Sequence, residues 1–382
     1  MLTDDEAIAL ARGLQAGFGA TAQDHDRSGS FPHANLTKLR EAGLLALTCR
    51  REWGGDGLGI ETASRVVETI ARGEPATALV LAMQYIHHGA PAAHGEWRAD
   101  GHERLTREAV ASGALLNVMR VEPELGTPTR GGTPATVATK TASGWRISGR
   151  KLYATGGPGL AYFVTYASVE GGEPGAGWFA VPAGSKGLSL VQTWDHLGMR
   201  ATGSDDLVLD GVELPPELGL QTGIVPGAGL EPYTGLWNNL VISAVYHGIA
   251  KSARDWLVRY LHERKPTNLG ASLATLPRMQ AAVGDIETLL ATSERLLYGI
   301  AAEADAKGCT FPLMMQSSQA KHVICENAIK SVEIGLRLVG NPGLSRHNAL
   351  ERHYRDVLCA RVHVPQEDMV LAMAGKAALG IR

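Results

Sequence analysis

All of the strand-forming signal in this sequence lies in one central block, and this distribution limits most strongly what the chain can fold into. Short runs of β-branched and aromatic residues, separated by Gly and Pro, are found at Gly144–Ser148, Tyr162–Tyr166, Trp178–Val181 and Leu207–Leu209. A Rossmann-type chain would alternate strands and helices from its start. The Gly-rich segment Gly156–Gly159 precedes another strand rather than a helix, so it predicts neither a dinucleotide fingerprint nor a P-loop.

Helical periodicity flanks this block on both sides. Apolar residues recur at three- and four-residue steps through Ala7–Phe18, Leu36–Leu45, Ile60–Ile70, Met279–Leu297 and Val323–Val339. Pro277, Pro312 and Pro342 are expected between helices. The order predicts a mainly α protein with a helical domain over 1–115, a small antiparallel β-barrel domain over 116–222, and a helical bundle over 230–382.

Charge and cysteine content exclude several classes of protein. The 382 residues include 36 Lys+Arg and 39 Asp+Glu, a formal net charge of −3, which argues against a nucleic-acid binder. No apolar run approaches the ~18 residues of a membrane span, and the start, MLTDDEAIALARG, has no signal-peptide pattern. The four cysteines are far apart and without metal-like spacing. We therefore expect a cytoplasmic enzyme without metal.

Four Gly-rich segments carry the family resemblance. They are Arg50–Gly59, Val121–Thr127, Gly149–Gly157, and Leu197–Asp205 followed by Val208–Pro215. Each alone is an ordinary turn sequence. In this order and spacing they resemble the loops of the acyl-CoA dehydrogenase superfamily of flavoproteins, over essentially the whole chain. The resemblance implies an N-terminal helical domain, a β-barrel and a C-terminal four-helix bundle.

The resemblance also implies where a flavin would lie. It places Val121 and Thr127 along the flavin, Thr155 near the ring nitrogen N5, and Tyr153 against the ring, where the family usually has Trp. A flavin needs hydrogen-bonding groups along its pyrimidine edge and at N5, together with an apolar or aromatic wall. The alternative for Tyr153 is a strand residue packed in the core of the β-domain.

Two departures affect the choice of flavin. Arg264 matches a family residue that reaches the FAD of a neighbouring subunit, but Lys265 and Pro266 follow it instead of the family's aromatic residue and Gly. Gly340 and Gly343 match a turn that receives the adenine half, with Pro342 replacing one Gly. Arg264 and Gln280 are candidate diphosphate contacts, or else solvated helix residues. FAD is the first choice and FMN the second.

The position of the catalytic base departs further from the family. An acyl-CoA dehydrogenase uses a Glu to remove an α-proton from a thioester. Counting from the pair Arg355–Asp356 puts Val364 at that position, and the alternative position on the first bundle helix holds Asn238. Neither side chain can accept the proton, and Glu367 is a candidate substitute after a loop rearrangement.

The segment around His363 more closely resembles the flavin monooxygenases typified by dibenzothiophene monooxygenase. His363 and Pro365 match that branch, in which the His lies beside the flavin and supports its reaction with oxygen. His87 and His88 fall where the branch places another active-site His. Their alternative is a capping or core role at a helix end before Gly89.

Three functions remain open from the sequence. The first is a flavin-dependent oxidoreductase acting on an acyl thioester or a related small molecule, with an electron-transfer flavoprotein as partner. The second is a two-component monooxygenase supplied by a flavin reductase. The third is a protein that binds flavin or ligand without turnover. Because the bundle helices are apolar beyond one face, we expect a homotetramer built through the bundle.

Overall fold

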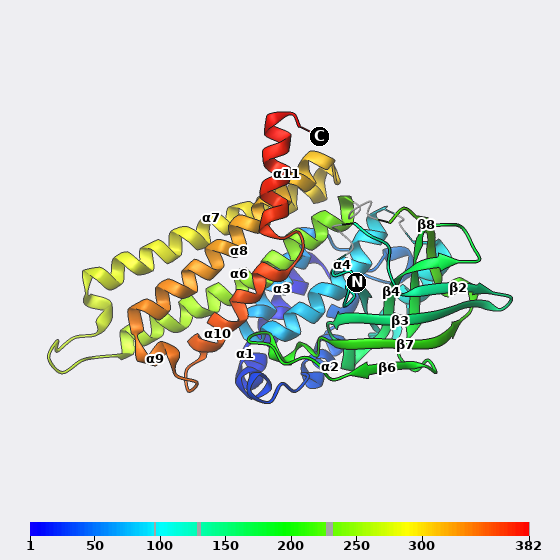
Figure 1. Cartoon of the computed structure of the whole chain (residues 1–382). Helices are drawn as coiled ribbons and strands as arrows, with labels where there is room; N and C mark the ends of the chain where they lie inside the picture. Colours follow the sequence, from blue (N-terminus) through cyan, green and yellow to red (C-terminus); the bar gives the residue numbers. More distant parts are fainter. Residues whose placement is uncertain (95–96, 128–130, 227–231, 382) are drawn as a thin grey trace.

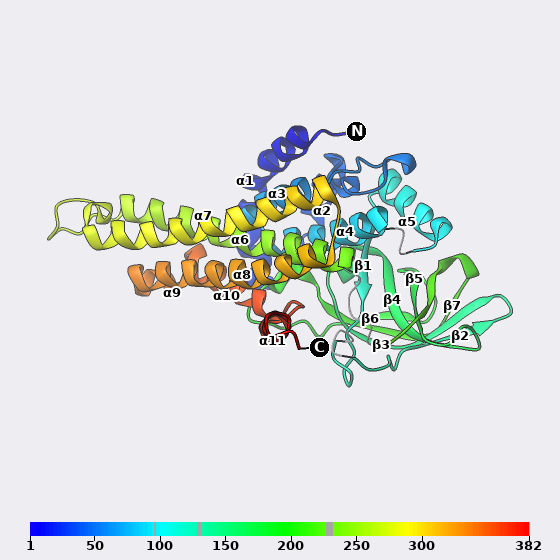
Figure 2. The same ribbon diagram turned by 90° about the horizontal axis from the view of Figure 1, so that it is seen from above.

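The computed structural model describes residues 1–94, 97–127, 131–226 and 232–381. Figure 1 shows a long helical bundle at one end of the molecule and a sheet at the other, with the N-terminal helices beside both. Figure 2, a perpendicular view, shows the same separation. The predicted fold class is therefore confirmed.

The N-terminal part is helical. Its helices are α1 (Asp4–Ser28), α2 (His33–Glu41), α3 (Ile60–Gly73), α4 (Pro75–His94) and α5 (Ala99–Ser112). Thr3 begins α1 in a capping box with Glu6, which satisfies backbone N–H groups that have no partner within the helix. The helix predicted over Leu36–Leu45 ends earlier, because Gly43 adopts a left-handed conformation at φ +75° and starts a short 3₁₀ turn.

Among the described residues, eight strands form one sheet in the middle of the chain. They are β1 (Leu115–Met119), β2 (Val137–Thr141), β3 (Gly144–Ala154), β4 (Leu160–Glu170), β5 (Ala176–Pro182), β6 (Leu188–Val191), β7 (Asp205–Leu214) and β8 (Gly219–Ile224). The order is β6-β7-β3-β2-β4-β5-β8, with β1 also paired to β4. The prediction of a purely antiparallel domain is wrong, since β1 and β2 both run parallel to β4.

A buried ion pair joins two of the Gly-rich segments. Lys151 Nζ on β3 donates to Glu122 Oε1 at 2.6 Å, and both side chains are at most 1% exposed. The Glu122 carboxylate also accepts from the backbone N–H groups of Ala135 and Thr136. It therefore fixes the segment after β1 onto β3 and onto the start of β2.

The C-terminal part is a helical bundle of three long helices and several shorter ones. Its helices are α6 (Pro232–Glu263), α7 (Pro277–Lys307), α8 (Phe311–Val339), α9 (Asn341–Leu344), α10 (Ala349–Leu358) and α11 (Glu367–Leu379). The prolines do not separate the helices as expected. Pro277 and Pro312 lie in the first turns of α7 and α8, where a backbone N–H is not needed, and Pro342 lies within α9. No helix of the described residues is long and apolar enough to cross a membrane.

Removing the cation of the buried pair tests its role. Lys151→Met leaves the Glu122 carboxylate buried without its ion partner, so the free energy of unfolding should fall by about 3–5 kcal/mol. Adding Glu122→Gln to this variant should recover most of the loss. Urea unfolding of the single and double variants measures both changes. Lys140→Met, at an exposed lysine of neighbouring β2, is the control. If Lys151→Met lost as little unfolding free energy as Lys140→Met, the ion pair with Glu122 would not stabilise the fold.

Candidate functional site

Asn117 joins the middle of β1 to the turn after β3. Its side-chain Nδ2 donates to the Thr155 carbonyl at 2.9 Å, and its Oδ1 accepts from the Val118 N–H at 2.7 Å. Leu152 N–H donates to the Val121 carbonyl at 2.9 Å, so the segment that carries Val121 and Thr127 lies against β3. Val121 and Thr127 are both partly exposed. The second and third Gly-rich segments therefore meet, as the resemblance implies.

Side-chain hydroxyls connect the third segment to the fourth. Thr155 Oγ1 lies 2.9 Å from Ser204 Oγ, which lies 2.7 Å from Thr202 Oγ1. The Thr202 hydroxyl in turn contacts the Met199 carbonyl at 3.0 Å. Thr155 is thus one end of a short hydrogen-bonded chain of hydroxyl groups.

Tyr153 faces outward beside this chain. It is 49% exposed and has φ +60°, and its ring meets those of Trp194 and His196 edge-on at centroid distances of 6.3 and 6.1 Å. The alternative of a residue packed in the β-domain core is wrong, because the left-handed backbone turns the ring out of the strand. An exposed aromatic side chain next to hydroxyl groups gives the combination of apolar and hydrogen-bonding surface that is typical of small-molecule sites.

The two adjacent histidines of α4 point in different directions. Neither lies at a helix end before Gly89, because α4 continues to His94. His87 hydrogen-bonds with Asn117, and partial burial together with the charge of Arg120 lowers its pKa to about 3. His88 is fully buried and stacks on His102 at 6.3 Å within the N-terminal part. The structure therefore brings His87, but not His88, to the motif segments.

His363 lies in the bundle against α6. Its Nε2 is 2.6 Å from the Tyr246 hydroxyl, while Lys321 Nζ donates to the His363 carbonyl at 2.8 Å. Burial and the Lys321 charge lower the pKa of His363 to about 3, so the ring is neutral at neutral pH. Burial holds the pKa of Tyr246 well above its usual value of 10, so its hydroxyl keeps its proton and can donate to Nε2.

The two family positions for the base contact each other. Asn238 Nδ2 donates to the Val364 carbonyl at 2.7 Å, so both positions are held in a neutral hydrogen bond. The nearest acids in the sequence, Glu367 and Asp368, lie exposed in the first turn of α11, where acids match the helix dipole.

One hydrogen bond ties the fourth segment to the bundle. Met199 N–H donates to Asp356 Oδ1 at 2.7 Å, with Met199 held at φ +53°. The segment touches α10 so closely that a Cβ on Gly198 would lie 2.2 Å from the Arg355 carbonyl. Burial raises the pKa of Asp356 to about 7, against the opposing charges of Arg352 and Arg355.

The remaining predicted contacts lie elsewhere. Arg264 follows α6, Gln280 lies in the first turn of α7, Gly340 ends α8, and Gly343 is buried in α9. Figure 1 shows that α9 and the α6–α7 connection lie at the end of the bundle opposite the sheet. Arg264 and Gln280 are exposed, and Gln280 Nε2 donates to the Ala274 carbonyl at 3.1 Å. One copy of the chain therefore does not bring these residues to Thr155.

Sequence reasoning missed three members of the site, Asn117, Ser204 and Tyr246. Asn117 is the single polar residue in the apolar strand Leu115–Met119, which is a signal that could have revealed it. Ser204 lies inside the fourth segment and was not singled out. Tyr246 has no local signal, because its role depends on His363 arriving from 117 residues away. No group of three or more potential metal ligands occurs among the described residues.

Family models match most of the chain. The N-terminal domain of acyl-CoA dehydrogenases matches residues 11–97, the middle domain 118–212 and the C-terminal domain 240–367. The chain belongs to the acyl-CoA dehydrogenase superfamily, a group of flavin-dependent oxidoreductases.

Relatives come from more than one branch of this superfamily. The acyl-CoA dehydrogenase-like protein YdbM of Bacillus subtilis (strain 168) is 34% identical over 93% of this chain and 91% of its own. The amino sugar nitrososynthase DnmZ of Streptomyces peucetius is 28% identical over 88% of this chain and 84% of its own. The FMN-bound structure of TdsC, a dibenzothiophene monooxygenase from Paenibacillus sp. A11-2, has a TM-score of 0.87 at 22% identity and covers 98% of both chains.

The pKa of Asp356 predicts how stability depends on pH. The unfolded chain loses this proton near pH 4, whereas the folded chain keeps it until about pH 7. Stability should therefore fall as pH rises through this range, by up to about 4 kcal/mol at about 1.36 kcal/mol per pKa unit. Asp356→Asn should remove this slope and keep an acceptor for Met199.

Urea midpoints of wild type and Asp356→Asn between pH 4 and 8 measure the difference. Asp210→Asn, at an exposed aspartate of β7, is the control. If the urea midpoints of wild type and Asp356→Asn changed with pH in parallel, the Asp356 carboxyl would be ionised over the whole range. That result would contradict the prediction.

Proposed function

We propose that this protein is a flavin-dependent oxidoreductase of the oxygen-activating kind, acting on a small organic substrate. The observation that carries the proposal is that both family positions for the base lack a carboxylate, since they hold Asn238 and Val364. The Asn238 side chain donates to the Val364 backbone carbonyl, and neither side chain can remove an α-proton from a thioester. The similarity to an amino sugar nitrososynthase supports the same class.

The residues around Thr155 fit a flavin. Tyr153 offers an exposed aromatic face, Thr155 offers a hydroxyl held by Ser204, and the Val121 carbonyl accepts from Leu152 N–H beside them. In our proposal Val121 and Thr127 contact the flavin from this adjoining segment. A bound flavin supplies two-electron redox chemistry and, once reduced, reactivity toward oxygen. In our proposal Thr155 hydrogen-bonds N5, while Tyr153 covers the ring.

Two neutral imidazoles supply the polar groups of the site. Because Tyr246 can donate to His363 Nε2, the hydrogen on Nδ1 remains available to a ligand. His87 is oriented by Asn117, which also holds the Thr155 carbonyl. We propose that His363 and His87 hydrogen-bond the oxygen and the substrate as neutral imidazoles.

FAD is our first choice of cofactor and FMN the second. The bundle-end residues Arg264, Gln280, Gly340 and Gly343 would contact the adenine half of an FAD only from a neighbouring copy. Exposed apolar side chains favour such an assembly: Val362, Leu371 and Leu379 are 52–74% exposed. We therefore propose a homotetramer, with a flavin reductase as the electron-supplying partner.

A plain acyl-CoA dehydrogenase is the second candidate, favoured by the identity to YdbM. It would require Glu367 to move from the exposed first turn of α11 to the substrate, and would pass electrons to an electron-transfer flavoprotein. A protein that binds flavin without turnover is the third candidate.

Two substitutions test the oxygen-activating proposal. His363→Ala removes the imidazole beside Tyr246, so reoxidation of the protein-bound reduced flavin by dissolved oxygen should slow by at least about tenfold. Val364→Glu restores a carboxylate at the family position and should create acyl-CoA dehydrogenase activity that the wild type lacks. Stopped-flow absorbance and steady-state assays with a panel of acyl-CoAs measure the two effects.

His347→Ala, at an exposed histidine of the bundle, is the control for the first variant. Fast turnover of acyl-CoA by the wild type that disappears in Glu367→Gln would contradict the proposal. It would favour the second candidate, an acyl-CoA dehydrogenase with Glu367 as its base.

The flavin contact of Thr155 has its own test. Thr155→Val keeps the shape but removes the hydroxyl, which should weaken flavin retention or shift its reduction potential, because a hydrogen bond at N5 favours one redox state. A loss of about 1 kcal/mol, roughly fivefold in Kd, is expected. Flavin titration and potentiometry measure both, with exposed Thr292→Val on α7 as control. An unchanged affinity and potential would refute this placement of the flavin.

A further inference from the structure

Lys321 is a buried lysine of the bundle that the proposed function does not use. It lies on α8 and is only 4% exposed. Lysine is almost never fully buried without partners, because taking an ammonium group out of water is costly. The groups that hold Lys321 therefore indicate what this buried charge is for.

The partners of Lys321 are backbone carbonyl groups rather than acids. Its Nζ donates to the His363 carbonyl at 2.8 Å and to the Pro365 carbonyl at 3.0 Å. Among the described residues no carboxylate forms an ion pair with it. Hydrogen bonds from a charged donor are stronger than those between neutral groups. Lys321 therefore holds the chain at both ends of residues 363–365, which we call the His363 segment.

The carbonyl in the middle of the His363 segment is held as well. Asn238 Nδ2 on α6 donates to the Val364 carbonyl at 2.7 Å. Three consecutive carbonyls thus accept hydrogen bonds from side chains of the bundle. The segment lies between a 3₁₀ turn at Cys359–Val362 and α11, outside regular secondary structure. Side chains of α6 and α8 therefore provide the hydrogen bonds that a helix or a strand would otherwise give these carbonyls.

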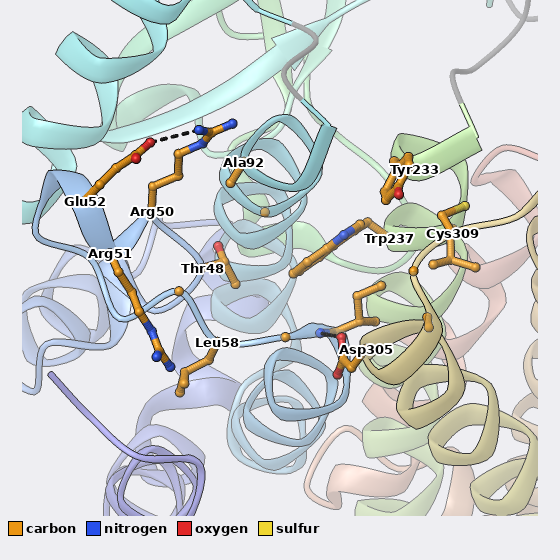
Figure 3. Close-up of a pocket in the computed structure, with 17 residues that line it drawn as sticks. Thr48, Arg50, Arg51, Glu52, Leu58, Ala92, Tyr233, Trp237, Asp305 and Cys309 are labelled. Atoms are coloured by element: carbon orange, nitrogen blue, oxygen red, sulfur yellow. Dashed lines mark hydrogen bonds and ion pairs between the residues drawn. The ribbon is translucent and has the colours of Figure 1, made fainter.

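This arrangement lies on a different side of α6 from the cavity shown in Figure 3. The cavity has a volume of about 680 Å³ and lies between the N-terminal helices and the bundle, with Trp237 in its wall. Asn238, the next residue of α6, points about 100° away and reaches Val364 instead. Lys321 and His363 are not among the residues that line the cavity. A substitution at Lys321 therefore leaves the walls of this cavity unchanged.

A second contact holds the imidazole at its far end. His363 Nε2 lies 2.6 Å from the Tyr246 hydroxyl, and the centroids of the two rings are 5.5 Å apart. Lys321 fixes the backbone from which the side chain starts, and Tyr246 fixes the tip of the ring. The direction of Nδ1 follows from these two contacts together. If the backbone moved, the contact between Nε2 and Tyr246 would be lost.

We propose that Lys321 is a positioning residue for His363. Its ammonium group holds the carbonyls at both ends of the His363 segment, so that the imidazole keeps Nε2 on Tyr246 and leaves Nδ1 free for a ligand. The catalytic part of this proposal rests on the proposed function, in which His363 hydrogen-bonds the oxygen or the substrate. The positional part rests only on the hydrogen bonds given above.

Chemical modification of His363 tests the positional part without using the flavin reaction. Diethyl pyrocarbonate acylates neutral imidazole nitrogens, and peptide mass spectrometry gives the rate at each histidine of the flavin-loaded full chain. Lys321→Met removes the donors, so the freed segment should open more often and release Nε2 from Tyr246. His363 should then be modified at least about threefold faster than in wild type. Exposed His347 in the same sample should keep its rate.

A double-variant cycle tests the catalytic part. Reoxidation of the protein-bound reduced flavin by dissolved oxygen should slow by at least about fivefold in Lys321→Met, because the imidazole is misplaced. In the His363→Ala background the same substitution should change the rate by less than about twofold, since no imidazole is left to position. Lys321→Gln keeps a neutral donor and should lie between wild type and Lys321→Met in both measurements. Should Lys321→Met not fold, Lys321→Gln takes its place.

Lys330→Met, at an exposed lysine of the same helix, is the matched control and should behave like wild type. Equal modification rates of His363 in Lys321→Met and Lys330→Met would overturn the proposal. An equal slowing of reoxidation by Lys321→Met with and without His363 would overturn it too. If His363→Ala left reoxidation unchanged, the proposed function would fail instead, and the modification rate would still decide whether Lys321 holds His363.

Discussion

The hydrogen bond from Met199 N–H to Asp356 is the contact on which the arrangement of the site depends. It joins the segment Leu197–Ser204, which leaves the sheet, to α10 of the bundle. The same segment supplies Thr202 and Ser204 to the hydroxyl chain that ends at Thr155. Because Met199 has a left-handed backbone and is buried, its conformation persists only while its neighbours hold it. The bundle thereby fixes the position of a hydroxyl group on the sheet.

The protonation state of the two histidines limits the chemistry that they can perform. Burial keeps the imidazoles of His87 and His363 neutral at neutral pH. Such groups can donate and accept hydrogen bonds but are weaker proton acceptors than a carboxylate placed against a substrate. The chemistry that suits them is stabilisation of a polar oxygen species rather than abstraction of an α-proton.

The fold could be predicted because its main signal is local. The spacing of apolar residues along consecutive positions indicates helices and strands, and Gly-rich turns separate the strands. The parallel pairing of β1 and β2 with β4 could not be predicted, since it depends on contacts between distant segments. The orientation of His87 and His88 was equally hidden, because two adjacent histidines on a helix point about 100° apart and only the packing decides which faces the site.

Thr155, Tyr153 and Val121 were predicted from the motifs, and the structure brings their segments together. Tyr246 acquires its role only when the segment of His363 packs on α6, and Asp356 only when the bundle meets the segment Leu197–Ser204, so no motif marks those roles. Arg264 and Gln280 show another limit of prediction from sequence. Their motifs are local, but in our proposal the FAD that they contact belongs to another copy of the chain.

Anaerobic mixing of the flavin-loaded protein with a panel of acyl-CoAs tests whether any group in the site removes an α-proton. The absorbance near 450 nm, roughly the band of any oxidised flavin, should stay unchanged over many minutes, because no base removes the α-proton. Rapid bleaching by any acyl-CoA would contradict this prediction and would show that a carboxylate reaches the substrate after all.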